Sequence, residues 1–175
     1  LAQSGNTITD KRERTLFKLE QHGIRRIEGV QRRVPLLKPE PEDGLAVEDR
    51  AGACPRYVGG TLTISELSAA LECLRQREVE GGLLPKYYYP SAGSLYPVQV
   101  YVSVRPGGVE GVEAGCYYYN PREHGLELLG RDLGLEEQGQ GSFTLHLVSD
   151  LSAIRPLYGN LSEVFSHQEA GYMAN

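Results

Sequence analysis

The chain has 175 residues, a length that suits one domain with a substantial core. Its formal net charge of −5 at pH 7 argues against a nucleic-acid-binding protein, which would need a basic surface. Neither its 3 cysteines nor its 4 histidines have the spacing of metal ligands, a pattern typical of a reduced, cytoplasmic protein. We recognise no signal peptide and no apolar run long enough to span a membrane.

The first third of the chain is predicted to be an N-terminal arm. Asp10 and Glu13 fit a helix capping box, and two leucines follow them at helical spacing. Residues 35–52 are rich in proline and acidic side chains, which predicts an extended linker. We therefore expect an arm over residues 1–52 and one domain over residues 53–175.

A second helix is predicted to begin after Thr63. Thr63 and Glu66 form a T-x-x-E capping box. The apolar residues that follow recur at i, i+3, i+4 and i+7, which predicts one buried helical face. They are Leu67, Ala70, Leu71 and Leu74.

Alternating apolar residues predict several strands in the second half of the chain. Two of these strands form a hairpin, in which the rings of residues 117–119 are expected to point alternately inward and outward. Helices are predicted from Ser152 and near Ser162. The order of elements predicts an α+β fold with a mainly antiparallel sheet flanked by helices. The predicted strands are residues 98–104, 115–119, 126–129 and 143–148.

The segment from residue 86 to residue 97, K-Y-Y-Y-P-S-A-G-S-L-Y-P, joins a lysine, several tyrosines and a turn of small residues. A lysine among aromatic rings can lose hydration and act as a base, and a neighbouring phenol can relay or stabilise the proton. Lys86 and Tyr87 are therefore candidate catalytic residues. The alternative is a lysine that packs over an aromatic cluster through a cation–π contact.

The small-residue turn of this segment is a candidate ligand-binding surface. Its side chains are short or absent, so backbone N–H groups can approach a flat aromatic ligand closely. A plain connection between loop and strand is the alternative. Arg56, shortly before the capped helix, could hold a phosphate with its guanidinium group, or it could be an ordinary surface arginine. The turn residues are Pro90, Ser91, Ala92 and Gly93.

The pattern K-Y-x-Y-P-S-A-G-S-L-Y-P-V-Q-V-Y resembles the SagB-type dehydrogenases of the nitroreductase superfamily. More narrowly, it is similar to the azoline-oxidising domains embedded in nonribosomal peptide synthetases. Four further segments agree with this resemblance, so that it touches most of the chain. They are residues 17–25, 115–126, 154–159 and 169–173.

The resemblance implies a nitroreductase-like fold and an FMN-dependent enzyme that oxidises thiazoline or oxazoline rings to thiazoles or oxazoles. It implies a homodimer, neighbouring synthetase domains, and a substrate that is a peptide or is bound to a carrier protein. Lys86 and Tyr87 would be catalytic. The residues implied to contact FMN are Arg56, Pro90, Ser91, Ala92, Gly93 and Leu95.

The sequence departs from that family in two places. The phosphate-gripping pattern Arg-x-Ser-x-Arg is reduced to Gly-Ala-Cys-Pro-Arg at residues 52–56, and we expect the fold to be incomplete beyond Asn175. Two other interpretations stay open. One is a general nitroreductase-like flavoprotein that takes hydride from NAD(P)H, and the other is a degenerate domain that serves as a structural spacer. The lysine–tyrosine pair favours the azoline oxidase, whereas the reduced phosphate pattern favours the spacer.

Overall fold

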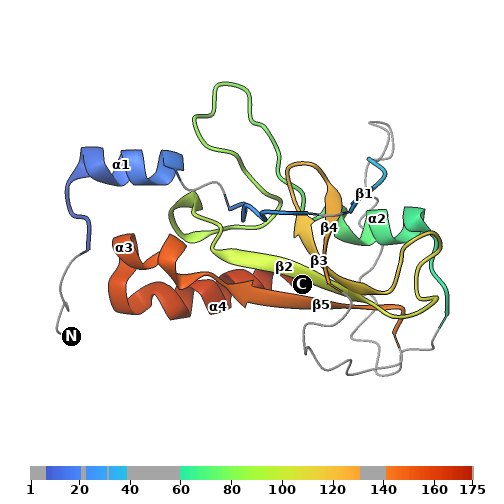
Figure 1. Cartoon of the computed structure of the whole chain (residues 1–175). Helices are drawn as coiled ribbons and strands as arrows, with labels where there is room; N and C mark the ends of the chain where they lie inside the picture. The colour runs from blue at the N-terminus through green and yellow to red at the C-terminus, as the bar shows by residue number, and fades with distance from the viewer. Residues whose placement is uncertain (1–6, 21–22, 31, 39–59, 131–140, 175) are drawn as a thin grey trace.

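The computed structural model describes residues 7–20, 23–30, 32–38, 60–130 and 141–174 (Figure 1). Its centre is a five-stranded sheet with the order β1-β4-β3-β2-β5. The paired strands are all antiparallel, so the predicted α+β arrangement is confirmed. The strands are β1 (Arg33–Pro35), β2 (Val98–Val104), β3 (Gly115–Asn120), β4 (Gly125–Gly130) and β5 (Phe143–Ser149).

The two faces of the sheet are both covered by protein. Tyr117 and Tyr119 belong to the main hydrophobic core, whereas Tyr118 packs on the opposite face with Tyr101. The rings alternate between the two faces as expected. The expectation that the outward ring is exposed is wrong, because Tyr118 is fully buried. The backbone N–H of Arg25, in the chain that crosses this second face, donates to the Tyr118 hydroxyl at 2.7 Å.

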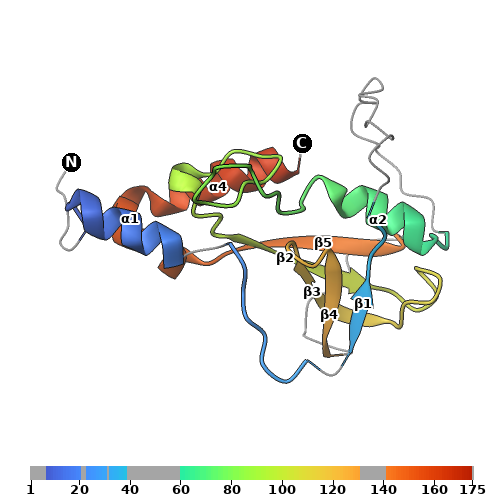
Figure 2. The same cartoon turned by 90° about the horizontal axis from the view of Figure 1, so that it is seen from above.

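In Figure 2, α2 and α4 lie over one face of the sheet, α1 lies beyond its end, and the chain after α1 passes along the opposite face. α2 begins at the predicted capping box, which is fully formed between Thr63 and Glu66. None of the helices in the described part of the chain has the length and apolar character that a bilayer crossing requires. The helices are α1 (Lys11–Glu20), α2 (Ile64–Glu72), α3 (Arg155–Tyr158) and α4 (Ser162–Met173).

The N-terminal arm is packed onto the domain through residues that the sequence pattern did not identify. Asp10 caps α1 as expected, accepting hydrogen bonds from the backbone of Arg12 and Glu13. However, Leu16 and Leu19 are exposed, and Phe17 is the α1 side chain that packs into a cluster with α3. Local helical spacing finds a stripe, but the neighbouring element decides which side of the helix is buried.

Just before the predicted linker, the arm forms a strand that the sequence pattern did not predict. β1 pairs with β4, with Val34 opposite Leu126. The next residues are held by a buried histidine, since the Leu36 N–H donates to the His124 carbonyl and the His124 ring lies 3.1 Å from the Leu37 carbonyl. Three residues are too few to show the alternation of apolar and polar side chains by which a strand is recognised in a sequence. The division at residue 52 falls outside the described residues.

Candidate functional site

Two segments that are close in sequence build the candidate site, a projecting ribbon and a tight bend. Residues 77–86 leave the body of the molecule as an antiparallel ribbon (Figure 1), which Arg77 and Lys86 close with two backbone hydrogen bonds. The ribbon fixes the backbone of Lys86. The cation–π contact of the ribbon is made by Arg77 rather than by Lys86. The Arg77 guanidinium lies 4.4 Å from the centre of the Tyr88 ring.

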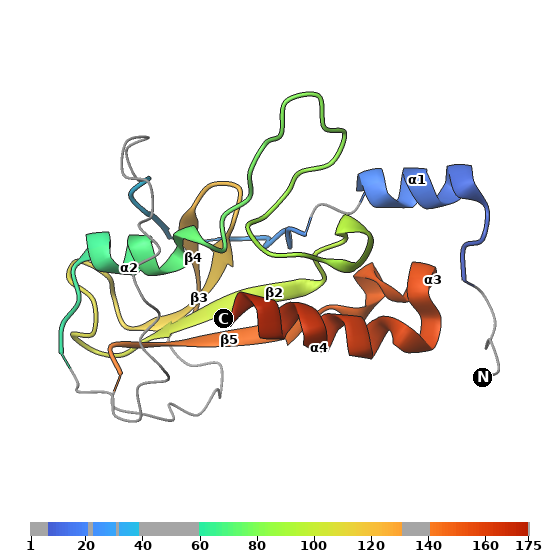
Figure 3. The ribbon, with the colours of Figure 1, turned by 180° about the vertical axis from the view of Figure 1, so that it is seen from behind.

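The bend contains a 3-10 turn, η1 (Ala92–Ser94), and has an unusual backbone. Gly93, Ser94 and Tyr96 all have positive φ angles, of 65°, 59° and 49°. Such angles are rare for residues with side chains, and they persist only where the surrounding contacts hold them. The bend lies between α1 and α3 in the view from behind (Figure 3).

Contacts on both sides of Gly93 explain why a glycine stands there. A Cβ atom at this position would lie 2.8 Å from the Tyr158 hydroxyl and 3.4 Å from Cε of Lys18. The sequence pattern did not single out Lys18, because it lies on α1, far from the bend along the chain. Its half-buried side chain brings a second lysine to the bend.

Lys86 reaches the bend directly. Its Nζ donates to the Ser94 hydroxyl at 2.7 Å, and the Ser94 side chain in turn hydrogen-bonds the Tyr96 phenol. The side chain of Lys86 is exposed, so the loss of hydration that we expected from the flanking tyrosines does not occur. The lysine and the small-residue bend therefore share one site, but at the surface.

Tyr87 points away from Lys86 and into the core. It is 8% exposed, and its ring centre lies 4.1 Å from that of Tyr96. Burial raises the pKa of Tyr87 far above its ordinary range, so the group stays a neutral phenol. Its hydroxyl donates to the Gly23 carbonyl at 3.4 Å.

A buried carboxylate supports the bend, and it was not among the predicted site residues, although its segment, residues 169–173, carries part of the family resemblance. Glu169 of α4 is 2% exposed, and its Oε1 accepts a hydrogen bond from the Val98 N–H at 3.2 Å. The Ser91 hydroxyl also hydrogen-bonds this carboxylate. The Oγ atom of Ser91 in turn accepts a hydrogen bond from the Tyr96 N–H at 2.9 Å. Burial raises the pKa of Glu169 to about 7, against which the two hydrogen bonds act.

The remaining predicted residues fall into three groups. Pro90 is exposed, and Ser91, Ala92 and Gly93 are half-buried, so a ligand can reach their backbone. Leu95 is fully buried against Ile154 and Leu157, so its side chain belongs to the core. Arg56 lies outside the described residues. The assignment of these residues to cofactor binding stays a prediction.

The donors around the bend fit a flat ring with acceptor atoms at its edge. Lys86, Lys18 and the Ser94 hydroxyl all lie beside the half-buried backbone of the bend. The isoalloxazine ring of a flavin has such an edge, with carbonyl oxygens and ring nitrogens. The residues present therefore suit the ring of FMN.

No protein-family profile matches the chain, but individual proteins do. It is 38% identical over 112 residues to the indigoidine synthase of Dickeya dadantii, and 37% identical over 113 residues to that of Streptomyces lavendulae. These matches cover 64% of the chain but only 7% and 8% of the synthases. The chain is also 31% identical over 128 residues to a protein of Methanocaldococcus jannaschii named as a nitroreductase, covering 67% of the chain and 62% of that protein.

Solved structures agree with this likeness. A protein of Ralstonia eutropha named as a nitroreductase superposes with a TM-score of 0.62 at 20% identity, over 85% of the chain and 70% of its own. A similarly named protein of Anabaena variabilis gives 0.53 at 27% identity, over 69% of the chain and 26% of its own. A chain of the E. coli microcin synthetase McbBCD complex gives 0.51 at 19% identity, over 79% of the chain and 60% of its own. The predicted fold and the predicted resemblance are both confirmed.

Proposed function

Starting from a chain with the nitroreductase-like fold and a sequence similar to segments of indigoidine synthases, we propose that it catalyses a flavin-dependent dehydrogenation. The proposed cofactor is FMN. The proposed substrate is a thiazoline or oxazoline ring in a peptide, free or bound to a carrier protein, and the product is the aromatic thiazole or oxazole. The chain spans only a small part of the synthases that it matches, so this activity is proposed for the domain alone.

The observation that carries this proposal is the contact between Lys86 and the bend. The Nζ of Lys86 lies 2.7 Å from the Ser94 hydroxyl, immediately beside the backbone that is proposed to carry the flavin ring. A dehydrogenation removes a proton and a hydride from neighbouring atoms. Base and hydride acceptor must therefore flank one small substrate.

In the proposed reaction the neutral amine form of Lys86 is the base that takes the proton from the azoline ring. The Ser94 hydroxyl holds the Nζ atom in place, and the ribbon fixes the lysine backbone. When bound, FMN supplies the hydride acceptor, and dioxygen restores it to the oxidised form. Two hydrogens leave the ring as a proton and a hydride, which balances the conversion of azoline to azole.

We keep Tyr87 as a proposed member of the site, but with a packing role instead of a role in proton transfer. Its phenol is buried and neutral, so it can support the packing of the aromatic layer beneath Lys86. The bend residues Ser91, Ala92 and Gly93 would hold the flavin ring through their backbone. Arg56 is proposed to contact the FMN phosphate.

A second candidate function is a nitroreductase-like oxidoreductase that passes hydride from NAD(P)H to flavin. The match to the M. jannaschii protein supports this candidate, since that protein is named as a nitroreductase. A dedicated base such as Lys86 is not needed for simple hydride transfer. For this reason we place the azoline oxidase first.

The proposed synthetase neighbours follow from the match to indigoidine synthases, and the proposed homodimer follows from the resemblance to SagB-type dehydrogenases. We propose that the chain works beside other synthetase domains and as a homodimer with FMN near the interface. The exposed side of α4 supports self-association, because Val164 and Tyr172 are 49% and 56% exposed there. Exposed apolar side chains on one side of a helix favour burial against a second surface.

The direct test is azoline oxidation by the purified protein supplied with FMN and dioxygen. We expect a thiazoline peptide to be converted to the thiazole, with turnover reduced at least about a hundredfold in Lys86→Ala, as for other general bases. Flavin content, read from the visible spectrum, should stay at the wild-type level. Lys11→Ala, which removes an exposed lysine at the start of α1, serves as the matched control and should leave turnover unchanged.

The alternatives give different results in the same assay. Flavin reduction by NADH without any turnover of azoline would favour the nitroreductase-like candidate. A colourless protein that takes up no FMN would indicate the structural spacer. Wild-type turnover in Lys86→Ala would remove the lysine from the mechanism.

A further inference from the structure

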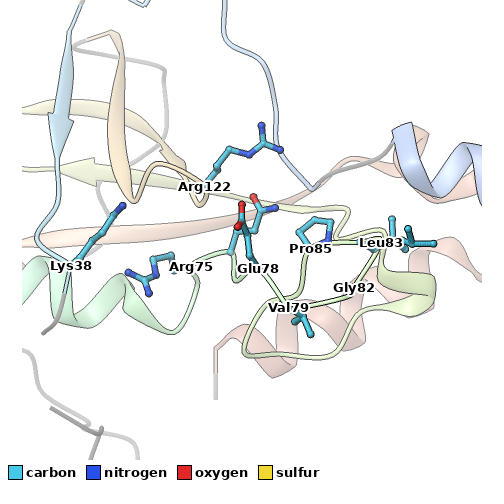
Figure 4. Close-up of a pocket in the computed structure, with 10 residues that line it drawn as sticks. Lys38, Arg75, Glu78, Val79, Gly82, Leu83, Pro85 and Arg122 are labelled. Atoms are coloured by element: carbon cyan, nitrogen blue, oxygen red, sulfur yellow. The ribbon is translucent and has the colours of Figure 1, made fainter. Parts of the chain in front are cut away.

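A cavity of about 630 Å³ lies beside the ribbon, and neither Lys86 nor the bend lines it. Figure 4 shows that its two sides differ in chemistry. Lys38 and Arg75 lie on the side formed by the end of the arm and the end of α2, and Arg122 stands on the turn between β3 and β4. The ribbon forms the opposite side, with Val79, Gly82, Leu83 and Pro85.

The cationic side carries an excess of positive charge. Lys38 and Arg122 are exposed, whereas Arg75 is held by Glu72 through an ion pair of 3.1 Å. Glu78 adds one carboxylate to the lining. Apart from the Arg75–Glu72 pair, the two cations Lys38 and Arg122 stand against the one carboxylate of Glu78, which favours an anionic ligand although the chain as a whole has a net charge of −5.

The ribbon side is apolar and open. Val79 and Leu83 are 49% and 82% exposed, which is unusual for aliphatic side chains that flank a cavity. Covering them removes apolar surface from water, which is favourable by about 25 cal/mol per Å². An aliphatic or ring portion of a ligand would supply that cover.

A third feature of the lining is an unsatisfied amide. The Oε1 atom of Gln76 is buried and has no hydrogen-bond partner among the described residues. A buried polar atom without a partner is costly, so a ligand that supplies a hydrogen bond once the Gln76 side chain rotates toward the cavity would gain affinity. An amide N–H in the ligand would meet this need.

The cavity also lies next to the proposed reactive residues. Pro85 lines it and directly precedes Lys86. Burial raises the pKa of Tyr87, and the positive charge of Arg122 acts in the opposite direction, which places this guanidinium near the phenol. The lining of the cavity therefore ends one residue before Lys86 in the chain.

We propose that this cavity binds the anionic end of the substrate, a carboxylate or a phosphate ester. The same substrate molecule also carries an amide and an apolar group. This inference rests on the proposed function, because the ligand is called a substrate only if Lys86, the residue after Pro85 of the lining, is the base. The cationic side takes the anion, Gln76 takes the amide and the ribbon covers the apolar group. The ring to be oxidised would extend past Pro85 to Lys86.

Binding of small probes tests this assignment without flavin or turnover. The probes are N-hexanoylglycine, which combines alkyl chain, amide and carboxylate, its uncharged glycinamide, and hexyl phosphate, each titrated into the protein by calorimetry. We expect at least one of the two anions to bind, and the glycinamide to bind more weakly. The tighter anion identifies the group as carboxylate or phosphate ester.

Charge variants give opposite expected shifts, which makes the test sharp. Lys38→Gln and Arg122→Gln should each weaken the anion about 2- to 5-fold, whereas Glu78→Gln should strengthen it by a similar factor. Arg155→Gln is the matched control, since Arg155 is an exposed arginine on α3 and is absent from the cavity. We leave Arg75 intact because of its pairing with buried Glu72.

Three results would overturn the proposal. The first is the absence of binding by either anion, and the second is equal binding by the uncharged glycinamide. The third is an affinity that Lys38→Gln, Arg122→Gln and Glu78→Gln all leave unchanged. Because these measurements involve neither FMN nor an azoline, they can fail while the proposed function holds, and the reverse.

Discussion

Glu169 is the residue whose chemistry depends most on the fold. Its carboxylate joins α4 to the Ser91 hydroxyl at the start of the bend and to the Val98 N–H at the start of β2. No charged partner compensates it among the groups that shift its pKa, so burial dominates and the carboxyl group favours its neutral form. The stability of the bend should therefore depend on pH.

The sign of that dependence follows from the raised pKa. Below its ordinary value of 4.5 the group is protonated in both the folded and unfolded chain, whereas between 4.5 and about 7 the folded chain binds more protons. The stabilising contribution of the neutral carboxyl is thus complete below 4.5 and is lost as the pH rises to about 7. The difference amounts to at most about 3 kcal/mol.

We predict that Glu169→Gln flattens this part of the pH profile. The free energy of unfolding, measured in urea from pH 4.5 to pH 8, should fall less steeply with pH in the variant than in the wild type. Glu163→Gln on the same helix is the control, because Glu163 is 65% exposed, and it should keep the wild-type slope. Parallel profiles for wild type and Glu169→Gln would mean that the group does not titrate in this window.

At the residue scale, the sequence predicted which side chains matter near the bend better than it predicted where they point. Lys86 was singled out by its pattern, yet its contact with Ser94 requires the positive φ angles at Gly93 and Ser94, which no local rule foresees. Tyr87 follows Lys86 directly and faces the core. Glu169 was missed because its hydrogen bond to Val98 joins residues 71 positions apart.

At the scale of elements, α2 is the clearest case in which local sequence and structure agree. The Thr63 side chain accepts from the Glu66 N–H at 3.2 Å, and the Glu66 carboxylate accepts from the Thr63 N–H at 2.8 Å. These two bonds satisfy backbone donors that the first helical turn leaves without partners. Leu67 and Leu71 are then fully buried against the sheet.

We predict that Thr63→Ala lowers the free energy of unfolding by about 1 kcal/mol, the usual cost of losing an N-cap side chain. Urea denaturation followed by circular dichroism would measure the change. Ser65→Ala is the matched control, because Ser65 is exposed in the same helical turn, and it should be close to neutral. An equal effect of both variants would show that the capping bonds contribute nothing specific.

The elements that the sequence mispredicted are those decided by distant partners. β1 has only three residues, and it exists because β4 offers an edge for pairing. The burial of α1 is set by the cluster around Ile154 and Leu157, which selects Phe17 over Leu16. Periodic patterns predict an element well when it buries a long regular face, as β2 and α2 do.

At the scale of the whole molecule, the account depends on one location, where ribbon, bend, α1 and α3 meet. Helices and sheet supply the rigid support, and the bend supplies a half-buried backbone with Lys86 and Lys18 beside it. The cavity beyond the ribbon extends this region toward a proposed substrate site. The central claim is that the flavin ring binds on the bend.

Titration of FMN into the protein, followed by quenching of flavin fluorescence, tests that claim most directly when wild type is compared with Gly93→Ala and Gly107→Ala. Both glycines have nearly the same positive φ angle, 65° and 66°, but only a Cβ at Gly93 meets other atoms within 4 Å. We predict saturable binding to wild type and to Gly107→Ala, and binding at least about tenfold weaker to Gly93→Ala, a loss of about 1.4 kcal/mol. Equal FMN affinity of Gly93→Ala and wild type, with both proteins folded by circular dichroism, would contradict the account.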